Sequence, residues 1–324
     1  GGRRPAAPRR GGGRHAGGVR QQFSTETNIL LARESVRVWE SFPERFGRDI
    51  GLRQQGYLFL LTDPAEEPAF RANVALQQSL DVPSRWVTPR EIAEINPYVV
   101  LDDVYGGTFC SEDGWCDTYG ATIGFAQAAR ALGVEFEGET PVTGIRAEGH
   151  RVRGVQTPQG DISAPLVVIA AGPQTRGVGA MAGVELPVDP FRRMSFITEP
   201  FDALPQSLPM TIDFATGLYF HPESRGFLIG MANRAEASSF NKTVDEDWMV
   251  TNVEALVARN AVASRQAENI RHAVETHSFK HAARQPLGTR GYTGLVSFGH
   301  GAISARVWLI SNDDRAGQVS TRDR

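Results

Sequence analysis

The sequence predicts an α/β (α+β) protein of mixed helices and strands, and two observations carry that prediction. Residues 118–172 begin as a helical pattern, continue with alternating apolar and polar residues, and end in the apolar run LVVIAAG. Beyond Pro187 the pattern changes to short β-type runs such as RRMSFITEP and GFLIGMAN. The 324 residues are 41% hydrophobic and 9% aromatic, which is enough to fill two domains or one large α/β unit.

The expected helices share apolar residues at helical spacing. Ser24 or Thr25 can cap the first, Pro89 lies in the first turn of another, and Gly133 closes the pattern TYGATIGFAQAARAL. These helices are expected at about residues 25–46, 68–80, 88–99, 118–132 and 245–263. Between two of them, YGGTFCSEDGWCD at 105–117 is expected to be a turn-rich crossing.

The expected strands differ in their patterns. GYLFLL at 56–61 predicts a buried strand, and VEFEGE at 134–139 predicts a further one. Residues 142–164 alternate apolar and polar residues across turns at Gly149 and Gly160, which predicts a small antiparallel meander. LVVIAAG at 166–172 is fully apolar, which predicts a central strand in a sheet covered on both faces. From about Glu275 no periodicity is sustained, so no element is predicted there.

The composition excludes several kinds of partner and location. A net charge of −3 does not indicate a polyanionic partner, and runs such as PLVVIAA at 165–171 are too short to cross a bilayer. The N-terminal arginines are not followed by an apolar stretch, so no secretory signal is expected. Cys110 and Cys116 have a poor spacing for a metal and indicate a reducing compartment. We therefore predict a cytoplasmic protein with unpaired thiols, no metal site and no membrane partner.

The first 18 residues contain only Gly, Arg, Pro, Ala and His, which cannot bury enough apolar surface to fold alone. We predict that residues 1–12 are disordered. All the arginines up to Arg20 precede the first acidic residue, Glu26, so a basic arm for nucleic acid is an alternative interpretation. No aromatic residue lies among them and no nucleic-acid-binding fold follows, so no nucleic-acid partner is predicted.

Several motifs in collinear order resemble one known family. They are GGVRQQFSTE, RQQGYLFLLTD, DGWCDTYGATIGFAQAARALGV, PVTGI, VVIAAGPQT, AMAGVELPVDPFRR and GLYFHPESRGFLIG. Together they span roughly residues 13–275 and resemble the FAD-dependent amine oxidoreductases of the D-amino-acid oxidase superfamily. Within that superfamily, the motifs are most similar to the branch of the sarcosine oxidase β-subunit and dimethylglycine dehydrogenase. The set is specific, whereas any single motif would be weak.

The resemblance implies a Rossmann-like FAD-binding domain interleaved with a substrate domain built on an antiparallel sheet. The FAD-binding pieces would be about 1–50, 112–186 and 279–324, and the substrate pieces about 51–111 and 187–278. The implied reaction moves a hydride to FAD from the carbon beside a secondary or tertiary amine, as in sarcosine, dimethylglycine or a D-amino acid. The implied partner is a small-molecule amine, and the family also includes hetero-oligomers and homo-oligomers.

The resemblance also implies cofactor-binding residues. Gly17 and Gly18 would let the backbone pass close to the flavin, and Arg14 would face an anionic group. In dimethylglycine dehydrogenases the histidine that matches His15 is covalently attached to the flavin, whereas an exposed loop histidine is the alternative here. Further cofactor contacts are expected at the meander and at the turn after LVVI; these residues are Val142, Ala170, Ala171 and Gly172.

Three residues are the candidates for the catalytic site. Arg20 would bind the substrate carboxylate through a two-pronged hydrogen-bonded contact; a surface arginine is the alternative. Tyr57 and Tyr219 lie on expected strands and could wall an amine pocket, or they could be plain core aromatics. His221 in YFHPE could line the same pocket, but a hydrogen-bonded histidine at the end of a strand is the favoured interpretation.

The chain departs from the family pattern at both ends. The family's strand and G-x-G-x-x-G turn should precede residue 13, and GGGRHAGG has no strand before it. Without that turn the FAD pyrophosphate loses its main anion site, so FAD binding is in doubt. At the other end, residues 279–324 keep only SFGHG at 297–301. The chain therefore reads as truncated at both ends, and a catalytically inactive remnant or a non-catalytic binding subunit is the alternative function.

Overall fold

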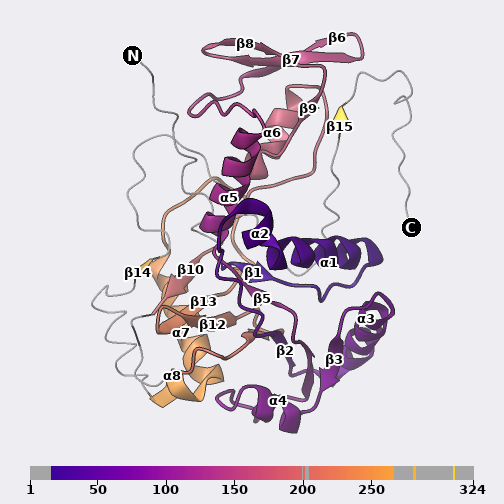
Figure 1. The fold of residues 1–324 in the computed structure, drawn as a ribbon. Helices are drawn as coiled ribbons and strands as arrows, with labels where there is room; N and C mark the ends of the chain where they lie inside the picture. Colours follow the sequence, from indigo (N-terminus) through magenta and orange to yellow (C-terminus); the bar gives the residue numbers. More distant parts are fainter. Residues whose placement is uncertain (1–15, 199, 201–203, 266–279, 282–308, 311–324) are drawn as a thin grey trace.

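The computed structural model describes residues 16–198, 200, 204–265, 280–281 and 309–310 (Figure 1). Helices and sheets are mixed throughout this part of the chain, as the sequence predicts. The largest sheet lies in the lower half of the view in Figure 1, and a three-stranded meander lies at the top. Among the described residues, no helix is long and apolar enough to span a membrane.

The largest sheet has eight strands in the order β14-β10-β13-β12-β11-β2-β4-β3. Its strands are β2 (Tyr57–Leu61), β3 (Ser84–Val87), β4 (Gly106–Cys110), β10 (Ser195–Ile197), β11 (Met210–Asp213), β12 (Tyr219–Glu223), β13 (Gly226–Gly230) and β14 (Lys280–His281). All neighbouring strands are antiparallel except β11 and β2, which pair in parallel. That parallel pair joins the first half of the sheet to strands that follow more than a hundred residues later in the sequence.

The segment at 105–117 corrects an expectation. It contains β4, which pairs with β2 on one side and β3 on the other, and β5 (Gly114–Trp115). Its glycines are part of the strand packing: a Cβ atom on Gly106 would overlap the Trp86 ring, and one on Gly107 would overlap the Phe59 carbonyl oxygen. Glycine is therefore required there by close contacts within the sheet rather than by a turn.

The helices begin and end close to the expected residues. They are α1 (Glu26–Glu40), α2 (Phe42–Phe46), η2 (Pro64–Glu66), α3 (Glu67–Ser79), α4 (Pro89–Ile95), α5 (Thr118–Ala131), η3 (Gly172–Gln174), α6 (Thr175–Ala180), α7 (Glu246–Arg259) and α8 (Ala261–Arg265). Thr88 and Glu91 form a capping box at the start of α4, directly before Pro89. Gly133 follows α5 with φ 88°. The helix expected at 245–263 is broken at Asn260, which is extended.

Three smaller sheets complete the described fold. β6 (Gly144–Glu148), β7 (Arg151–Thr157) and β8 (Gly160–Ser163) form the predicted antiparallel meander. β1 (Gly18–Val19) pairs with β5, and β9 (Val167–Val168) pairs with β15 (Leu309–Ile310).

Two strand predictions are wrong. Residues 134–139 form no strand, and all six are exposed, so their apolar side chains have no described layer to pack against. LVVIAAG contains only the two-residue β9, and Val168 is 58% exposed rather than covered on both faces. Both segments have the apolar side chains of a buried strand, but in the described part of the chain no layer of structure covers them.

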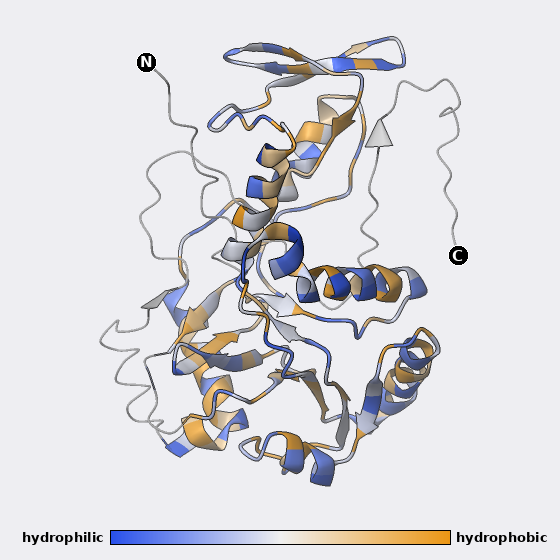
Figure 2. Ribbon diagram, viewed as in Figure 1, coloured by the Kyte–Doolittle hydropathy of each residue, from blue (hydrophilic) through white to orange (hydrophobic). Residues whose placement is uncertain are grey.

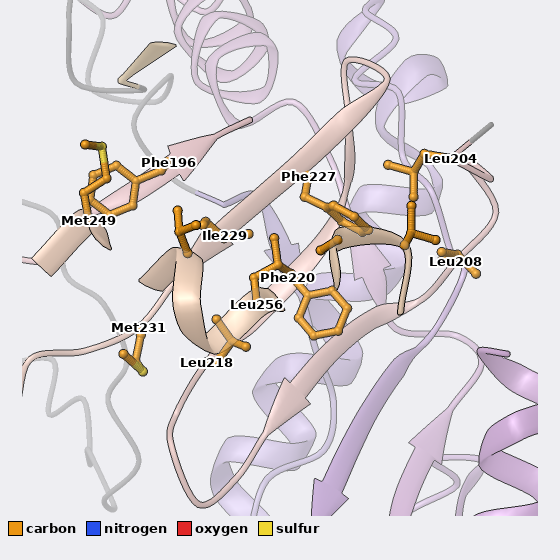
Figure 3. Close-up of a cluster of buried hydrophobic side chains, with 13 residues drawn as sticks. Phe196, Leu204, Leu208, Leu218, Phe220, Phe227, Ile229, Met231, Met249 and Leu256 are labelled. Atoms are coloured by element: carbon orange, nitrogen blue, oxygen red, sulfur yellow. The ribbon is translucent and has the colours of Figure 1, made fainter. Parts of the chain in front are cut away.

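Most of the core lies against the eight-stranded sheet. Figure 3 shows the main cluster, in which side chains of β10, β12 and β13 pack against Met249 and Leu256 of α7. Figure 2 shows the corresponding contrast in hydropathy, since α1 and α3 each carry apolar and hydrophilic residues on different faces. A second cluster joins α1, α2 and α5 through Val36, Phe42 and Ala121. These helices hold β1 and β5 against the large sheet.

Candidate functional site

Residues 17–22 begin with the short strand β1, which pairs with β5. Gly18 of β1 pairs with Trp115 of β5, and the Cys116 amide donates a hydrogen bond to the Gly17 carbonyl oxygen at 3.0 Å. The Arg53 amide in turn donates to the Trp115 carbonyl oxygen at 2.8 Å, so β5 is held from both sides. The residues that follow β1 therefore have a fixed position over β2 and β4.

Gly17 and Gly18 are required by contacts with the chain itself. Gly17 has φ 72°, and a Cβ atom there would overlap the carbonyl oxygen of Cys116. A Cβ atom on Gly18 would overlap the hydroxyl oxygen of Tyr57. The two glycines let β1 lie directly on β5 and on the Tyr57 side chain. The structure thus supplies a reason for both residues that differs from the expected approach to a flavin.

Arg20 lies partly buried among aromatic rings. The centre of its guanidinium group lies 4.5 Å from the centroid of the Phe23 ring and 5.6 Å from that of Phe59. Burial lowers the pKa of Arg20, while Tyr57 and Asp113 act in the opposite direction. Arg20 forms no salt bridge with any carboxylate in the described part of the chain. A guanidinium group in such a place has hydrogen-bond donors left for an anion.

Tyr57 lies close to both Arg20 and Tyr219. Tyr57 is 8% exposed and belongs to a cluster with Phe59 and Trp115, against which Tyr219 packs. Burial raises the pKa of Tyr57 above its usual value, and neighbouring Arg20 partly opposes this. Burial likewise raises the pKa of Tyr219 to about 12, opposed by a hydrogen bond with Ser195. Both phenols are therefore neutral at physiological pH. Of the three predicted catalytic candidates, the structure brings Tyr57 close to Arg20 and to Tyr219.

Asp113 holds the segment beyond Arg20, and the sequence analysis missed it. This carboxylate is fully buried and accepts hydrogen bonds from the Gln21 amide at 2.8 Å and from Gln22 Nε2 at 3.1 Å. Burial raises the pKa of Asp113 to about 6, although these hydrogen bonds act in the opposite direction. Residues 113 and 114 are an Asp-Gly pair, which typically indicates an exposed turn. The sequence therefore does not indicate that Asp113 is a buried acid.

Gln22 joins this carboxylate to the large sheet. Its Nε2 also donates to the Tyr57 carbonyl oxygen at 3.0 Å, and its Oε1 accepts from the Thr108 hydroxyl at 2.9 Å. The side chain is 7% exposed, so these bonds are made away from water. One glutamine thereby connects β2, β4 and the loop that carries Asp113.

His221 is buried beside the same cluster. Its ring centroid lies 4.4 Å from that of Trp115, and its Nδ1 lies 2.9 Å from the Pro222 carbonyl oxygen. Burial lowers the pKa of His221 to about 4, so the imidazole is neutral at physiological pH. Its Nε2 has no partner with full hydrogen-bond geometry in the described part of the chain, although the Ala16 backbone lies close enough to raise the pKa of the ring. The favoured prediction is a hydrogen-bonded histidine at the end of a strand. In the structure this holds for Nδ1 and not for Nε2.

The predicted cofactor residues are divided between two places. Arg14 and His15 lie outside the described residues. Val142 precedes β6, and Ala170 and Ala171 follow β9. Gly172 begins η3 with φ 54°. Figure 1 places β6, β9 and α6 in the upper part of the view, whereas β2 and β12 lie in the lower half. Gly17 and Gly18 are thus the only predicted cofactor residues within the described chain that lie beside Arg20.

A second arginine provides a contrast. Arg259 lines a pocket of about 290 Å³ together with Asp102, Asp103 and Asp213. Its guanidinium group already pairs with Asp103 at 2.6 Å and with Asp213 at 2.7 Å. Because its charge is neutralised within the chain, this pocket is a poorer anion site than the surroundings of Arg20.

Comparison with known proteins gives the class to which this fold and site belong. The model of the family "FAD dependent oxidoreductase" (DAO) matches residues 3–317, and the chain belongs to this family. The resemblance inferred from the motifs is therefore confirmed.

Three similar proteins illustrate the relationship. The human mitochondrial dimethylglycine dehydrogenase is 26% identical over 318 residues, covering 90% of this chain and 36% of that protein. The sarcosine oxidase subunit beta of Arthrobacter sp. is 25% identical over 198 residues, covering 60% of this chain and 49% of that protein. The crystal structure of L-proline dehydrogenase from P. horikoshii superposes with a TM-score of 0.67 and 28% identity, covering 82% of this chain and 68% of that one. The chain thus spans about a third to a half of the length of these two curated relatives.

The described residues lack the usual elements of a dinucleotide pyrophosphate site. A dinucleotide pyrophosphate is typically held where a strand passes through a glycine-rich turn into a helix. Among the described residues, no strand leads through such a glycine-rich turn into a helix of eight or more residues. β9 is followed by η3 and the six-residue α6, and β5 leads into α5 through Cys116 and Asp117. The partly buried Arg20 lies among aromatic rings, and the described chain shows no strand, glycine turn and long helix of the kind that holds the phosphates.

Proposed function

We propose that the chain contributes the substrate site of an FAD-dependent oxidoreductase that oxidises the C–N bond of a secondary or tertiary amino-acid amine. The observation that carries the proposal is the Arg20 guanidinium group, which lies among aromatic rings without a carboxylate partner in the described chain. The relatives support it by their names, since dimethylglycine and sarcosine are amino acids with a methylated amine.

The proposed roles follow from charge and position. Arg20 binds the substrate carboxylate with two hydrogen bonds, which fixes the orientation of the amino acid. Tyr57 and Tyr219 wall the pocket as neutral aromatic side chains, because their raised pKa values keep the phenols protonated. They contact the amine through their ring faces. FAD, when bound, supplies the acceptor for the hydride from the carbon beside the amine.

The proposed domain division places the eight-stranded sheet in the substrate domain. Pieces 51–111 and 187–278 supply seven of its strands, and pieces 1–50, 112–186 and 279–324 belong to the FAD-binding domain. In this arrangement Val142, Ala170, Ala171 and Gly172 contact FAD, and His15 is the candidate for covalent attachment. The name "subunit beta" of one relative favours assembly with further subunits. Cytoplasmic location stays a prediction.

A second candidate function is a binding subunit without catalysis. The observation that favours it is the lack of a strand, glycine turn and long helix for the pyrophosphate among the described residues. Such a subunit would bind the amino acid or a partner protein and would not oxidise the amine.

The visible spectrum of the purified chain, with added FAD, separates the two functions. Flavin absorbance that stays with the protein through gel filtration supports the oxidoreductase, and colour retained in an acid precipitate directs the next test to His15. A protein that takes up no FAD would contradict the oxidoreductase and support the binding subunit. Titration of that colourless protein with dimethylglycine then tests whether the Arg20 site binds an amino acid.

A further inference from the structure

We propose that Asp113 is a positioning residue that fixes Arg20 over Phe59 and sets how tightly the site binds a carboxylate. The inference rests on the proposed role of Arg20. It extends that role to a buried acid that makes no contact with the ligand. Its test is a binding measurement on the chain without FAD, so it can fail or succeed independently of amine oxidation.

The first step is mechanical. The Asp113 carboxylate accepts hydrogen bonds from the backbone of Gln21 and from the side chain of Gln22, the two residues that directly follow Arg20. The Gly56 amide donates to the Asp113 carbonyl oxygen at 2.8 Å, which attaches the same residue to the entrance of β2. The chain cannot move at Arg20 without breaking a buried, charge-assisted hydrogen bond. The direction of the guanidinium group is thereby fixed before a ligand arrives.

The second step is electrostatic. Asp113 is near enough to Arg20 to stabilise its charge, yet the two form no salt bridge. The guanidinium group is therefore stabilised while its donors stay available to a ligand. Because Asp113 is fully buried, its charge is poorly screened. An ionised Asp113 consequently repels a carboxylate bound at Arg20, and a neutral Asp113 does not.

The groups that face Asp113 determine how it titrates. They are Arg20, Gln21 and Gln22 on the β1 side, Tyr57 of β2 and the Cys110 thiol of β4. Burial raises the pKa of Tyr57 and of Cys110, so both are neutral between pH 5 and 8. Burial also places the pKa of Asp113 at about 6, so its charge is lost as the pH falls through that value. Carboxylate binding should therefore become tighter below pH 6.

The test measures the dissociation constant of glycolate, a small carboxylate that stays ionised over this range, by calorimetry from pH 5 to pH 8. Wild type should bind glycolate about three- to tenfold more tightly at the acid end. Asp113→Asn keeps the shape of the side chain without its charge, and should bind at pH 8 as wild type binds at pH 5. Asp113→Ala also loses the hydrogen bonds, and should bind more weakly than wild type at every pH.

Glu44→Gln is the control, because Glu44 is an exposed acid on α2, a different element from the one that carries Asp113. It should leave the pH profile unchanged. Asp113→Glu restores the charge and should restore part of the pH dependence. In an Arg20→Met background, Asp113→Asn should have a much smaller effect, because without Arg20 the carboxylate is no longer held close to Asp113.

Equal pH profiles for wild type and Asp113→Asn would overturn the proposal, as would an effect of Asp113→Asn that persists undiminished in Arg20→Met. Wild-type protein that binds no glycolate would overturn it together with the carboxylate role of Arg20. If glycolate binds as expected but no amine is oxidised, the inference holds and the proposed oxidoreductase fails. Thermal melting of each variant excludes loss of fold as the cause of a change.

Discussion

The eight-stranded sheet and the upper meander with β9 both contain apolar strand residues, but these residues differ in how deeply they are buried. All five residues of β2 and all five of β13 are buried, whereas all four residues of β8 are exposed. Leu58 of β2 is 0% exposed and Val168 of β9 is 58% exposed. The difference teaches that strands of the eight-stranded sheet next to Tyr57 are buried, whereas the predicted cofactor residues after β9 lie on a thinly packed part of the described chain. Four predictions test this contrast.

A large expected effect concerns two ion pairs of the same type. Asp213→Ala removes the more buried of the two carboxylates that pair with Arg259 and leaves only the more exposed Asp103, so it should lower the free energy of unfolding by about 3 kcal/mol. In the meander, Arg146 and Asp161 lie 3.0 Å apart with both side chains over a third exposed, so Asp161→Ala should cost less than about 1 kcal/mol. Urea unfolding measures both values, and equal losses would remove the contrast.

Shortening an apolar side chain should also cost more stability in the eight-stranded sheet than in β9. Leu58→Ala opens a cavity between β2 and α4, and should cost about 2–5 kcal/mol. Val168→Ala removes a mostly exposed side chain and should change stability by less than about 0.5 kcal/mol. Thermal unfolding of the two variants is the measurement. A large loss for Val168→Ala would indicate that β9 is covered in the folded protein.

Glycine substitutions should have opposite signs in the two regions. Gly18→Ala forces a methyl group against the Tyr57 hydroxyl and should destabilise by about 1–3 kcal/mol. Adding Tyr57→Phe removes that hydroxyl and should recover part of the loss. Gly177 lies within α6 with open space around its Cβ position, so Gly177→Ala should stabilise by about 0.4–1 kcal/mol. Failure of Tyr57→Phe to recover any stability would show that Gly18 is constrained by something other than this contact.

The last expected effect is a pair of opposed pH dependences at two buried groups near Trp115 and Arg20. The pKa of His221 is lowered by burial to about 4 from a usual value of 6.5, so its contribution to stability is lost as the pH falls through that window. The pKa of Asp113 is raised by burial to about 6, so acidification below that value stabilises the fold. Relative to wild type between pH 6.5 and 4.5, His221→Gln should gain stability and Asp113→Asn should lose it. Parallel curves for the three proteins would contradict both assignments.

The sequence predicts elements well where local chemistry decides them. Thr88, Pro89 and Glu91 specify the start of α4, and Gly149 and Gly160 mark the turns of the meander. Prediction from the sequence fails where contacts between residues far apart in the chain determine the structure. Gly106 and Gly107 indicate a turn until Trp86 and Phe59 are known to lie against them.

The candidate site was partly predictable for the same reason. Arg20, Tyr57 and Tyr219 stand in motifs that resemble the family, so the sequence alone could select them. Asp113 could not be selected, because only the folded chain brings it to Gln21 and Gln22, ninety residues away in the sequence. The apolar run at 166–172 predicted burial that the described residues do not provide.

The most direct test of the central claim is anaerobic mixing of the FAD-treated chain with dimethylglycine while flavin absorbance is followed. The account predicts bleaching in wild type and in Arg71→Met, which removes a guanidinium group that stacks on Trp86 at the surface. It predicts slow bleaching that does not saturate with dimethylglycine in Arg20→Met, because the carboxylate is no longer held. Equal bleaching of Arg20→Met and wild type at low dimethylglycine concentration would contradict the claim that Arg20 forms the substrate site.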